Sequence, residues 1–352
     1  MTILVTGAAG FIGSNFVLDW LNQSKEDVVS LDLLTYAGNL ENLSSLVNNP
    51  HHHFVRGNIG DRDLVSSLLK KYQVRAIINF AAESHVDRSI HESKYFIETN
   101  IVGTYNLLQS ARSYWYDLNK NLKQDFLFLH ISSDEVYGSL NLTDPPSNER
   151  DPYKPSSPYS ACKAASGHLV HAWFQTYKLP VLTVNSANNY GPYQFPEKLI
   201  PLCILNALNG KPLPIYGDGQ QIRDWLYVKD HCTAIREILK HSQIGETYNV
   251  GGCNEKTNLE VVETLCAILD ELKPKSDGKS YAEQITFVKD RPGHDKRYAI
   301  DASKLRSEIN WQPQESFETG LRKTVLWYLD NETWMNHIVS GEYQDWVQKQ
   351  YS

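Results

Sequence analysis

The stretch Met1-Thr-Ile-Leu-Val-Thr-Gly7-Ala-Ala-Gly10-Phe-Ile-Gly13 decides the fold of this chain. A short apolar run leads into three glycines at three-residue spacing, which is typical of a strand that turns tightly into a helix. Glycine permits the tight turn, lets backbone N–H groups approach a pyrophosphate, and lets the helix pack closely on the strand. The stretch therefore predicts the start of a dinucleotide-binding domain, with Gly7, Gly10 and Gly13 at the cofactor.

A carboxylate follows at the distance that such a domain needs. The second apolar run, Val28-Val-Ser-Leu31, ends in Asp32, nineteen residues after Gly13. In dinucleotide folds a carboxylate at this place binds the ribose 2′-OH of the cofactor. Because a carboxylate repels a 2′-phosphate, Asp32 predicts NAD rather than NADP.

Apolar runs alternate with amphipathic segments through the first half of the chain, which predicts an α/β fold with a Rossmann-type doubly wound parallel sheet. Beyond residue 188 the chain is dense in turn residues and predicts a smaller, irregular α+β substrate lobe. We expect an NAD-binding domain over 1–188 with a return segment at 228–252, and a substrate-binding lobe and C-terminal tail over 189–227 and 253–352. The predicted strands are 2–6, 27–32, 52–56, 75–80, 125–131 and 180–185, and the predicted helices lie near 11–24, 61–72, 93–118 and 159–177.

Composition narrows the class of protein. The net charge of −7 argues against nucleic-acid binding. The five cysteines form no C-x-x-C pair, which indicates reduced thiols in a cytoplasmic protein. Residues 1–18 carry no charge, but they lack a basic start and contain three glycines, so we expect no signal or membrane segment. Three histidines at 51–53 lie in a polar turn, and we assign no metal.

A tyrosine and a lysine stand one helical turn apart. Pro158 suits the first position of a helix, which would place Tyr159 and Lys163 on one face. A free tyrosine has a pKa of about 10 and is a poor base at neutral pH. A neighbouring ammonium favours the phenolate, so the pair predicts a tyrosine base with a lowered pKa. Alone, the spacing is also common for a pair on a helix surface.

Two carboxylates end another predicted strand. The apolar run 126–131 reads as a buried parallel strand, and Ser132-Ser133-Asp134-Glu135 follows it. Parallel strands deliver their last residues to the carboxyl edge of the sheet, where open α/β folds bind ligands. In isolation these residues fit an ordinary polar strand end. Together with the glycines and the Tyr159/Lys163 pair, they indicate a catalytic site.

With these motifs in view, the chain resembles the dTDP-glucose 4,6-dehydratases of the extended short-chain dehydrogenase/reductase superfamily. The resemblance covers nearly the whole length and rests on the segments 35–38, 81–90, 134–138, 189–193, 195–202, 221–228 and 291–295. It implies that dTDP-glucose loses water to give dTDP-4-keto-6-deoxyglucose, in deoxysugar (rhamnose-type) biosynthesis. The superfamily shares the glycines and the Tyr/Lys pair, whereas Asp134-Glu135 marks a dehydratase.

The resemblance also implies roles for individual residues. Tyr159 would take the proton of the sugar 4-OH while a hydride leaves C4 for NAD, and Lys163 would hold the ribose. Glu135 would then remove the C5 proton while protonated Asp134 donates to the departing 6-hydroxyl. The family usually has Thr where this chain has Ser133, which keeps the hydroxyl for the sugar 4-OH, and Asp where it has Asn58, whose amide oxygen can still accept from adenine.

The binding residues and the assembly are implied in the same way. We expect a homodimer through the helices near 93–118 and 159–177. The expected substrate-binding residues are Ser84, Asn189, Glu197, Lys198, Pro214, Tyr216, Arg223, Asn258, Arg291 and His294. The expected cofactor-binding residues are Gly7, Gly10, Phe11, Ile12, Gly13, Asp32, Thr35, Asn58, Ile59, Ala81, Thr99, Tyr159 and Lys163.

Three alternatives stay open at this point. An epimerase of the same superfamily would share the fold and the Tyr/Lys pair, but it needs no carboxylate pair to expel a 6-hydroxyl. A non-catalytic NAD-binding or scaffolding protein would need none of the four side chains Asp134, Glu135, Tyr159 and Lys163. A dehydratase could also act on another nucleotide sugar, such as UDP-glucose, since recognition of the base depends on loop geometry.

Overall fold

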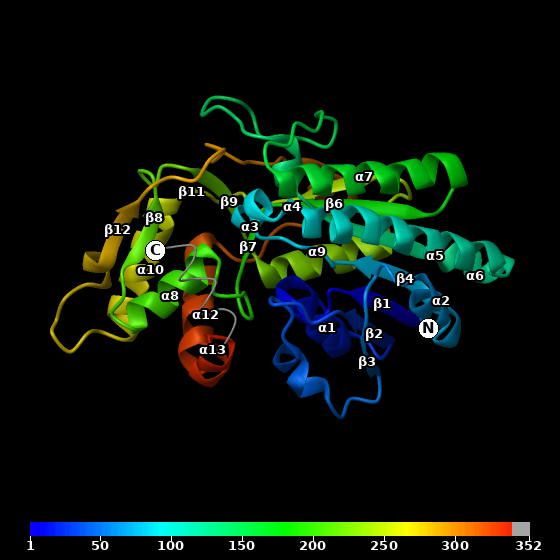
Figure 1. Cartoon of the computed structure of the whole chain (residues 1–352), viewed down its shortest axis with the longest axis horizontal. Helices are drawn as coiled ribbons and strands as arrows, with labels where there is room; N and C mark the ends of the chain where they lie inside the picture. The colour runs from blue at the N-terminus through cyan, green and yellow to red at the C-terminus, as the bar shows by residue number, and fades with distance from the viewer. Residues whose placement is uncertain (340–352) are drawn as a thin grey trace.

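A seven-stranded parallel sheet forms the centre of this computed structural model, which describes residues 1–339. The strand order is β10-β6-β5-β4-β1-β2-β3 (Figure 1), so the Rossmann-type α/β fold predicted from the sequence is confirmed. The order reverses between β1 and β4, and ligands of open α/β sheets bind at such a switch point. The strands are β1 (Thr2–Thr6), β2 (Asp27–Asp32), β3 (His52–Arg56), β4 (Val74–Asn79), β5 (Leu127–Ser133), β6 (Val181–Ser186) and β10 (Thr247–Val250).

Helices cover both faces of this sheet (Figure 1). On one face, α1 (Phe11–Gln23), α9 (Val228–His241) and α11 (Ser303–Ile309) pack onto apolar side chains of β1, β4 and β5. On the other face lie α2 (Arg62–Lys71), α5 (Thr104–Asp117) and α7 (Pro158–Tyr177). Because both faces are buried, the central strands β1, β4 and β5 carry apolar side chains on both faces rather than on alternate residues.

The chain returns to the main sheet after it has built part of the lobe. Strand β10 pairs in parallel with β6, with Thr247 opposite Thr183 and Val250 opposite Ser186. The preceding helix, α9, packs against α1. A return segment near 228–252 thus joins the sheet, while the exact domain boundaries at 188, 227 and 253 stay a prediction.

The lobe has two small sheets and a hydrophobic core of its own. The sheets are β11-β9-β7 and β12-β8, and their core partners include Tyr190, Ile204, Leu265 and Phe317. Figure 1 shows the lobe at the left of the main sheet. Its elements are β7 (Asn188–Tyr190), α8 (Leu199–Leu208), β8 (Leu213–Tyr216), β9 (Ile222–Tyr227), β11 (Glu255–Thr257), α10 (Asn258–Leu272), η4 (Tyr281–Gln284), β12 (Ile285–Val288), α12 (Phe317–Asp330) and α13 (Glu332–Val339).

One predicted helix is interrupted. The segment 93–118 forms α4 (Ser93–Phe96), the π-helical turn η2 (Ile97–Gly103) and α5, instead of one α-helix. In η2 the side chain of Asn100 pairs with the backbone of Glu83, at 2.9 Å in both directions. A π turn widens the helix locally and often accompanies a functional site. The remaining short elements are η1 (Leu40–Leu46), α3 (Val86–His91), α6 (Lys120–Asp125) and η3 (Asp134–Tyr137).

Two glycines in helices should respond in opposite ways to alanine. A Cβ on Gly13 would lie 2.1 Å from the carbonyl oxygen of Gly7, whereas a Cβ on Gly167 in α7 meets only the Tyr153 ring at 3.7 Å. Gly13→Ala should therefore cost about 2–3 kcal/mol or more of unfolding free energy, because the backbone must shift. Gly167→Ala should be neutral or stabilise by up to about 1 kcal/mol. Urea unfolding followed by circular dichroism measures both, and equal losses would contradict the packing described for α1.

Candidate active site

A cavity of about 310 Å³ opens at the carboxyl ends of the central strands. It begins at the glycine turn between β1 and α1, passes Asp32 at the end of β2, and ends beside Asp134 and Glu135. It thus extends from the predicted dinucleotide site to the predicted catalytic residues, which the parallel sheet brings to one edge.

The glycine turn fits a pyrophosphate. Gly7 has a φ of +64°, and a Cβ there would lie 2.7 Å from the backbone nitrogen of Ala81. The backbone is therefore in the left-handed region that glycine favours and has no room for a side chain. The helix α1 begins directly after Gly10, so its free N–H groups face the cavity end of β1.

Backbone hydrogen bonds hold the carboxylate of Asp32 in place at the end of β2. Its two carboxylate oxygens accept hydrogen bonds from the backbone N–H groups of Ala9 and Leu34, each at 2.8 Å. Burial raises the pKa of Asp32, while N–H donors of Leu34, Ala9 and Gly10 lower it. Each carboxylate oxygen can accept more than one hydrogen bond, so the group can still bind a ribose hydroxyl.

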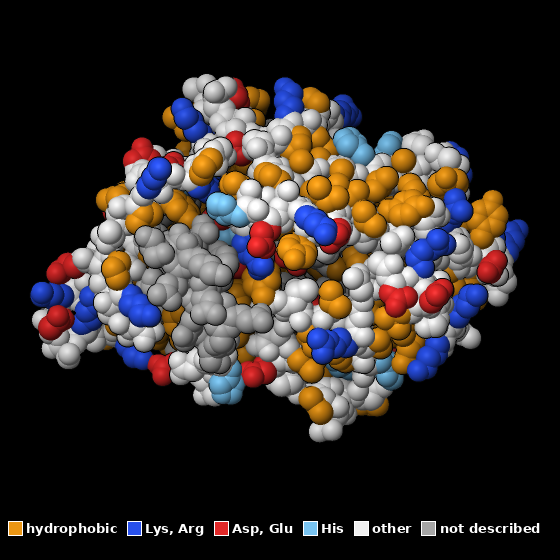
Figure 2. Space-filling model, viewed as in Figure 1, with side chains coloured by type: hydrophobic (Ala, Val, Ile, Leu, Met, Phe, Trp, Pro, Cys, Tyr) orange, Lys and Arg blue, Asp and Glu red, His pale blue; other side chains and the backbone are white. Residues whose placement is uncertain are grey.

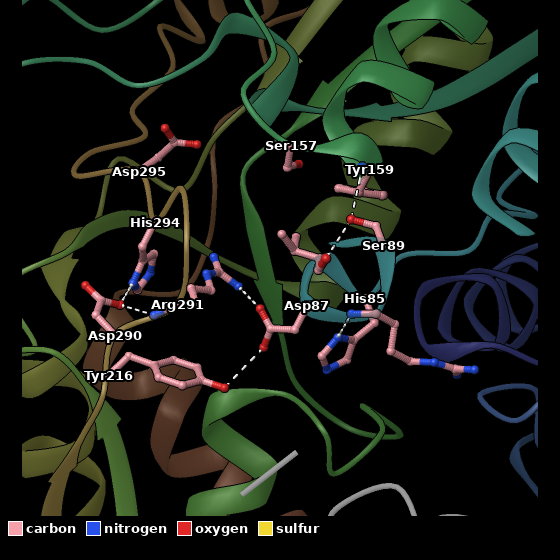
Figure 3. Close-up of polar contacts among 12 residues, drawn as sticks. His85, Asp87, Ser89, Ser157, Tyr159, Tyr216, Asp290, Arg291, His294 and Asp295 are labelled. Atoms are coloured by element: carbon pink, nitrogen blue, oxygen red, sulfur yellow. Dashed lines mark hydrogen bonds and ion pairs between the residues drawn. The ribbon is translucent and has the colours of Figure 1, made fainter. Parts of the chain in front are cut away.

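The start of α7 places the tyrosine. Ser157 caps the helix together with Ser160, and Pro158 occupies the first turn, as its fixed φ favours. The backbone N–H of Tyr159 donates to Ser89 Oγ of α3 at 3.2 Å (Figure 3). One turn later, buried Lys163 donates from Nζ to the carbonyl oxygen of Ile131 at 2.6 Å.

The predicted low pKa of Tyr159 is not what the structure has. Burial, followed by the charges of Glu135 and Asp134, raises the pKa of Tyr159, and only a hydrogen bond with Ser133 lowers it. The Lys163 ammonium donates to the carbonyl oxygen of Ile131, and burial lowers its own pKa to about 8. Helical spacing alone did not reveal that the lysine points to β5.

The two carboxyl groups differ in their surroundings. Burial raises the pKa of Asp134 well above its ordinary value, and the charges of Glu135 and Asp224 raise it further. Burial also raises the pKa of Glu135, but Arg291, Arg223 and Lys198 oppose this. Ser133 Oγ donates to Asp134 Oδ1 at 3.2 Å. The arrangement favours a protonated Asp134 beside an ionised Glu135.

The lobe supplies the nearby cations. Arg223 lies buried on β9, with its guanidinium carbon 4.4 Å from the Tyr298 ring centroid. Arg291 donates from Nη1 to Oδ1 of Asp87 at 2.7 Å, and the Tyr216 hydroxyl donates to Oδ2 at 3.3 Å. Figure 3 shows Arg291 and Tyr216 reaching from the lobe toward Asp87 of α3. The helix α3 therefore contacts both the start of α7, through Ser89, and the lobe, through Asp87.

The structure brings most predicted site residues to the one cavity. Six predicted substrate-binding residues lie outside its lining, all within the lobe: Pro214, Tyr216, Arg223, Asn258, Arg291 and His294. The predicted residues that line the cavity are Gly7, Gly10, Phe11, Ile12, Gly13, Asp32, Thr35, Asn58, Ile59, Ala81, Ser84, Thr99, Ser133, Asp134, Glu135, Tyr159, Lys163, Asn189, Glu197 and Lys198.

Sequence reasoning missed several residues of the site. Glu83 and Phe195 line the cavity, and Asp87 and Ser89 hold residues around it. All four stand in the segments 81–90 and 195–202 that carry the family resemblance. Their presence there was a usable signal, but the partners of Ser89 and Asp87 lie 70 and 204 residues away in the chain.

Comparison with known proteins identifies the family. The family model described as GDP-mannose 4,6 dehydratase matches residues 4–324. A dTDP-glucose 4,6-dehydratase of Xanthomonas campestris pv. campestris is 57% identical over 97% of this chain and 97% of its own. The chain belongs to the dTDP-glucose 4,6-dehydratase family.

Solved structures agree with this membership of the dTDP-glucose 4,6-dehydratase family. The enzyme of that name from Bacillus anthracis, crystallised in complex with NAD, is 44% identical with a TM-score of 0.85, covering 96% of this chain and 99% of its own. The one from Streptomyces venezuelae is 42% identical with a TM-score of 0.87, covering 96% of this chain and all of its own. The resemblance predicted from the motifs is confirmed.

The buried carboxyl group of Asp134 should cost stability at neutral pH. A carboxyl whose pKa is higher in the folded than in the unfolded state stabilises the fold at low pH, and this stabilisation is lost as the pH rises through the folded pKa. Asp134→Asn stays neutral, so we expect it to raise the melting temperature at pH 8 by about 2 °C or more, and by less as the pH falls toward about 4.

Differential scanning calorimetry at a series of pH values measures this difference in melting temperature between the variant and the wild type. Asp125→Asn, at an exposed site in α6, is the matched control and should show no pH-dependent gain. A variant of Asp134 that is less stable than the wild type at pH 8, or whose gain grows on acidification, would contradict the electrostatics described.

Proposed function

We propose that this chain converts dTDP-glucose to dTDP-4-keto-6-deoxyglucose and water, a hydro-lyase reaction of deoxysugar biosynthesis. The observation that carries the proposal is the carboxyl pair at the end of β5, beside Tyr159 and within reach of lobe cations. The family membership supports the same reaction. An epimerase would need the tyrosine but not the pair.

NAD is the cofactor of the proposed reaction. The glycine turn, Asp32, Asn58, Thr99 and Lys163 line the cavity that would hold it, and the Asp32 carboxylate disfavours a 2′-phosphate. When bound, NAD accepts the hydride from C4 of the sugar and returns it to C6. The other predicted cofactor residues, named above, complete this lining.

Three proton transfers, to Tyr159, to Glu135 and from Asp134, take part in the proposed reaction. Tyr159 takes the proton of the 4-OH, for which its hydroxyl must ionise. Ser133, bonded to it, orients that hydroxyl and the sugar. The resulting 4-ketone acidifies C5–H, so ionised Glu135 removes that proton while Asp134, kept protonated by burial, gives its own to the 6-hydroxyl. Water then leaves, and the double bond between C5 and C6 would take up the hydride at C6 and, at C5, a proton that Glu135 returns.

The lobe would bind the nucleotide. Arg223 and Arg291 suit a diphosphate because guanidinium groups bind phosphate oxygens in pairs. Both also lower the pKa of Glu135, so the same two guanidinium groups would act on the diphosphate and on the carboxyl pair. Ser84, Asn189, Glu197 and Lys198 line the cavity nearer the sugar, and Pro214, Tyr216, Asn258 and His294 belong to the lobe side.

Isotope labelling tests the reaction. Deuterium at C4 of dTDP-glucose should reappear at C6 of the same molecule, and a reaction in heavy water should place solvent deuterium at C5, because Glu135 exchanges its proton. Mass spectrometry of mixed labelled and unlabelled sugar should show no crossover. UDP-glucose run in parallel tests the alternative substrate, and equal turnover of both would overturn the preference for dTDP.

Variants separate the steps. Tyr159→Phe should form no sugar-dependent NADH absorbance. Asp134→Asn combined with Glu135→Gln should form it and stop before water is lost. A folded, NAD-binding double variant that gives neither NADH nor a 4-keto sugar would contradict these assignments.

We also propose a homodimer through α5 and α7. Exposed apolar side chains of this region include Ile97, Val102, Tyr105 and Tyr177. Figure 2 shows hydrophobic side chains gathered on the face where these helices lie in Figure 1. Stable dimers bury surfaces of this kind, on the order of 1,000 Å² or more in total.

A charge in this surface should weaken the dimer. Val102, 47% exposed, lies in η2. We expect Val102→Glu to raise the dimer dissociation constant at least about 10-fold, since a carboxylate would be desolvated there. Analytical ultracentrifugation measures it, with Val47→Glu, also exposed but beyond η1, as control. A dimer unaffected by Val102→Glu would place the interface elsewhere.

Location in the cell is a separate inference. The five cysteines form no disulfide, and four of them are buried. Within residues 1–339, none of the helices combines the length and the apolar character needed to cross a membrane. We propose a cytoplasmic protein, which cell fractionation tests.

A further inference from the structure

Five ionisable side chains gather beside the cavity, and two of them, Glu83 and Glu197, line it. Tyr36 comes from the loop after β2, Glu83, His85 and Arg88 from the segment after β4, and Glu197 from the turn before α8. The loop that follows Asp32, on the cofactor side, therefore meets a loop of the substrate lobe. None of the proton transfers described above uses this cluster.

Glu197 is held by one oxygen and presents the other. Its Oε1 accepts a hydrogen bond from the Tyr36 hydroxyl at 3.1 Å. Its Oε2 is buried and has no hydrogen-bond partner among residues 1–339. Only 5% of the residue is exposed, and it lines the cavity. A buried carboxylate oxygen without a partner is costly, and a ligand hydroxyl that donates to it would remove that cost.

Tyr36 is itself fixed on both sides. The Arg88 guanidinium lies 3.8 Å from its ring centroid, and the Phe195 ring packs edge-on at 5.7 Å. Burial and the charge of Glu197 raise the pKa of Tyr36 well above 10, so its hydroxyl keeps its proton and acts as a donor. The tyrosine stands four residues after Asp32 and thus connects the cofactor loop to Glu197.

His85 approaches the other oxygen of Glu197. Its Nδ1 accepts from the backbone N–H of Arg88 at 3.3 Å, which caps α3 and leaves the proton of the neutral ring on Nε2. That nitrogen lies 3.8 Å from Glu197 Oε2. Burial and the charges of Lys198, Arg88 and Arg291 lower the pKa of His85 well below its ordinary value, so the ring beside the carboxylate is neutral.

We propose that Tyr36 is a positioning residue that, together with His85, keeps Glu197 ionised and aimed at a hydroxyl of the bound sugar. This inference rests on the proposed function, because it takes a nucleotide sugar as the ligand. It adds a role for the loop after Asp32, which the dinucleotide motif assigns to the cofactor alone. The cofactor loop then sets the affinity for the sugar.

The charges around Glu197 determine in which direction sugar affinity should change with pH. The pKa of Glu197 is raised to about 7: burial and the charge of Glu83 raise it, whereas Lys198, the hydrogen bond from Tyr36 and Arg88 lower it. The ionised form accepts a hydroxyl best, so sugar affinity should fall as the pH drops below about 7. Loss of the Tyr36 hydroxyl removes a donor to the charged form and raises the pKa of Glu197.

The test is the pH dependence of sugar binding in Tyr36→Phe. The dissociation constant of dTDP-glucose is measured by calorimetry between about pH 5.5 and 8.5, in a Tyr159→Phe background that does not consume the sugar. The methyl ester of dTDP is the reference, since its diphosphate has the same charge but no sugar. We expect the midpoint for dTDP-glucose to move up by about one pH unit, which is about 5-fold weaker binding at pH 7, with no change for the ester.

Two variants keep the result interpretable. Tyr248→Phe is the matched control, because Tyr248 donates to Glu308 at 2.9 Å far from the cavity, and it should leave the midpoint unchanged. Glu197→Gln cannot ionise and should abolish the dependence, even if Tyr36→Phe fails to fold. His85→Asn, which keeps an acceptor for the α3 cap, should move the midpoint up by less than Tyr36→Phe.

The outcomes separate the two proposals. An unchanged midpoint in folded Tyr36→Phe, a shift shared by the methyl ester, or a dependence that survives Glu197→Gln would each overturn the role of Tyr36. Failure of the proposed function would instead appear as no loss of water from dTDP-glucose with the wild-type chain. In that case the same titration is run without the Tyr159→Phe background.

Discussion

Burial of two neighbouring carboxyl groups at the end of β5 is the constraint on which the site depends. Two carboxylates so close together and so little solvated cannot both ionise cheaply. Near Asp134, Arg223 and the Ser133 hydroxyl offset burial and the charges of Glu135 and Asp224 only in part, whereas three cations, Arg291, Arg223 and Lys198, act on Glu135. Adjacent residues of one type thereby acquire the opposite protonation states that elimination of water needs.

The parallel sheet makes that arrangement possible. All seven strands point the same way, so their carboxyl ends supply side chains to one edge. The cations come from the other side, on a lobe with its own core. Between the two, α3 is a short bridge: Ser89 holds the backbone of Tyr159, and Asp87 binds Arg291. A helix of six residues thus connects the position of the base to that of the lobe.

Another buried carboxyl group of the cavity, that of Glu197, has different surroundings. Glu197 is also buried, but hydrogen-bond donors and cations converge on it from three separate segments. Where Asp134 is driven toward its neutral form, Glu197 has a pKa close to neutrality and so responds to each contact around it. The same cavity therefore holds carboxyl groups with distinct electrostatic settings, and the difference comes from tertiary neighbours rather than residue type.

The sequence by itself determined the glycine turn, the alternation of strands and helices in the first half, the place of Asp32 at the end of a strand, and the family. These depend on local sterics, on periodicity and on short motifs. Strand β5 nevertheless runs two residues further than expected, and the helix over 93–118 contains a π turn that pairs Asn100 with Glu83. Only the tertiary structure decided that the Lys163 ammonium binds the carbonyl oxygen of Ile131, and that Tyr36 meets Glu197 across 161 residues of chain. Such contacts and the pKa values that follow from them depend on burial and on charges brought together by folding, which no local pattern records.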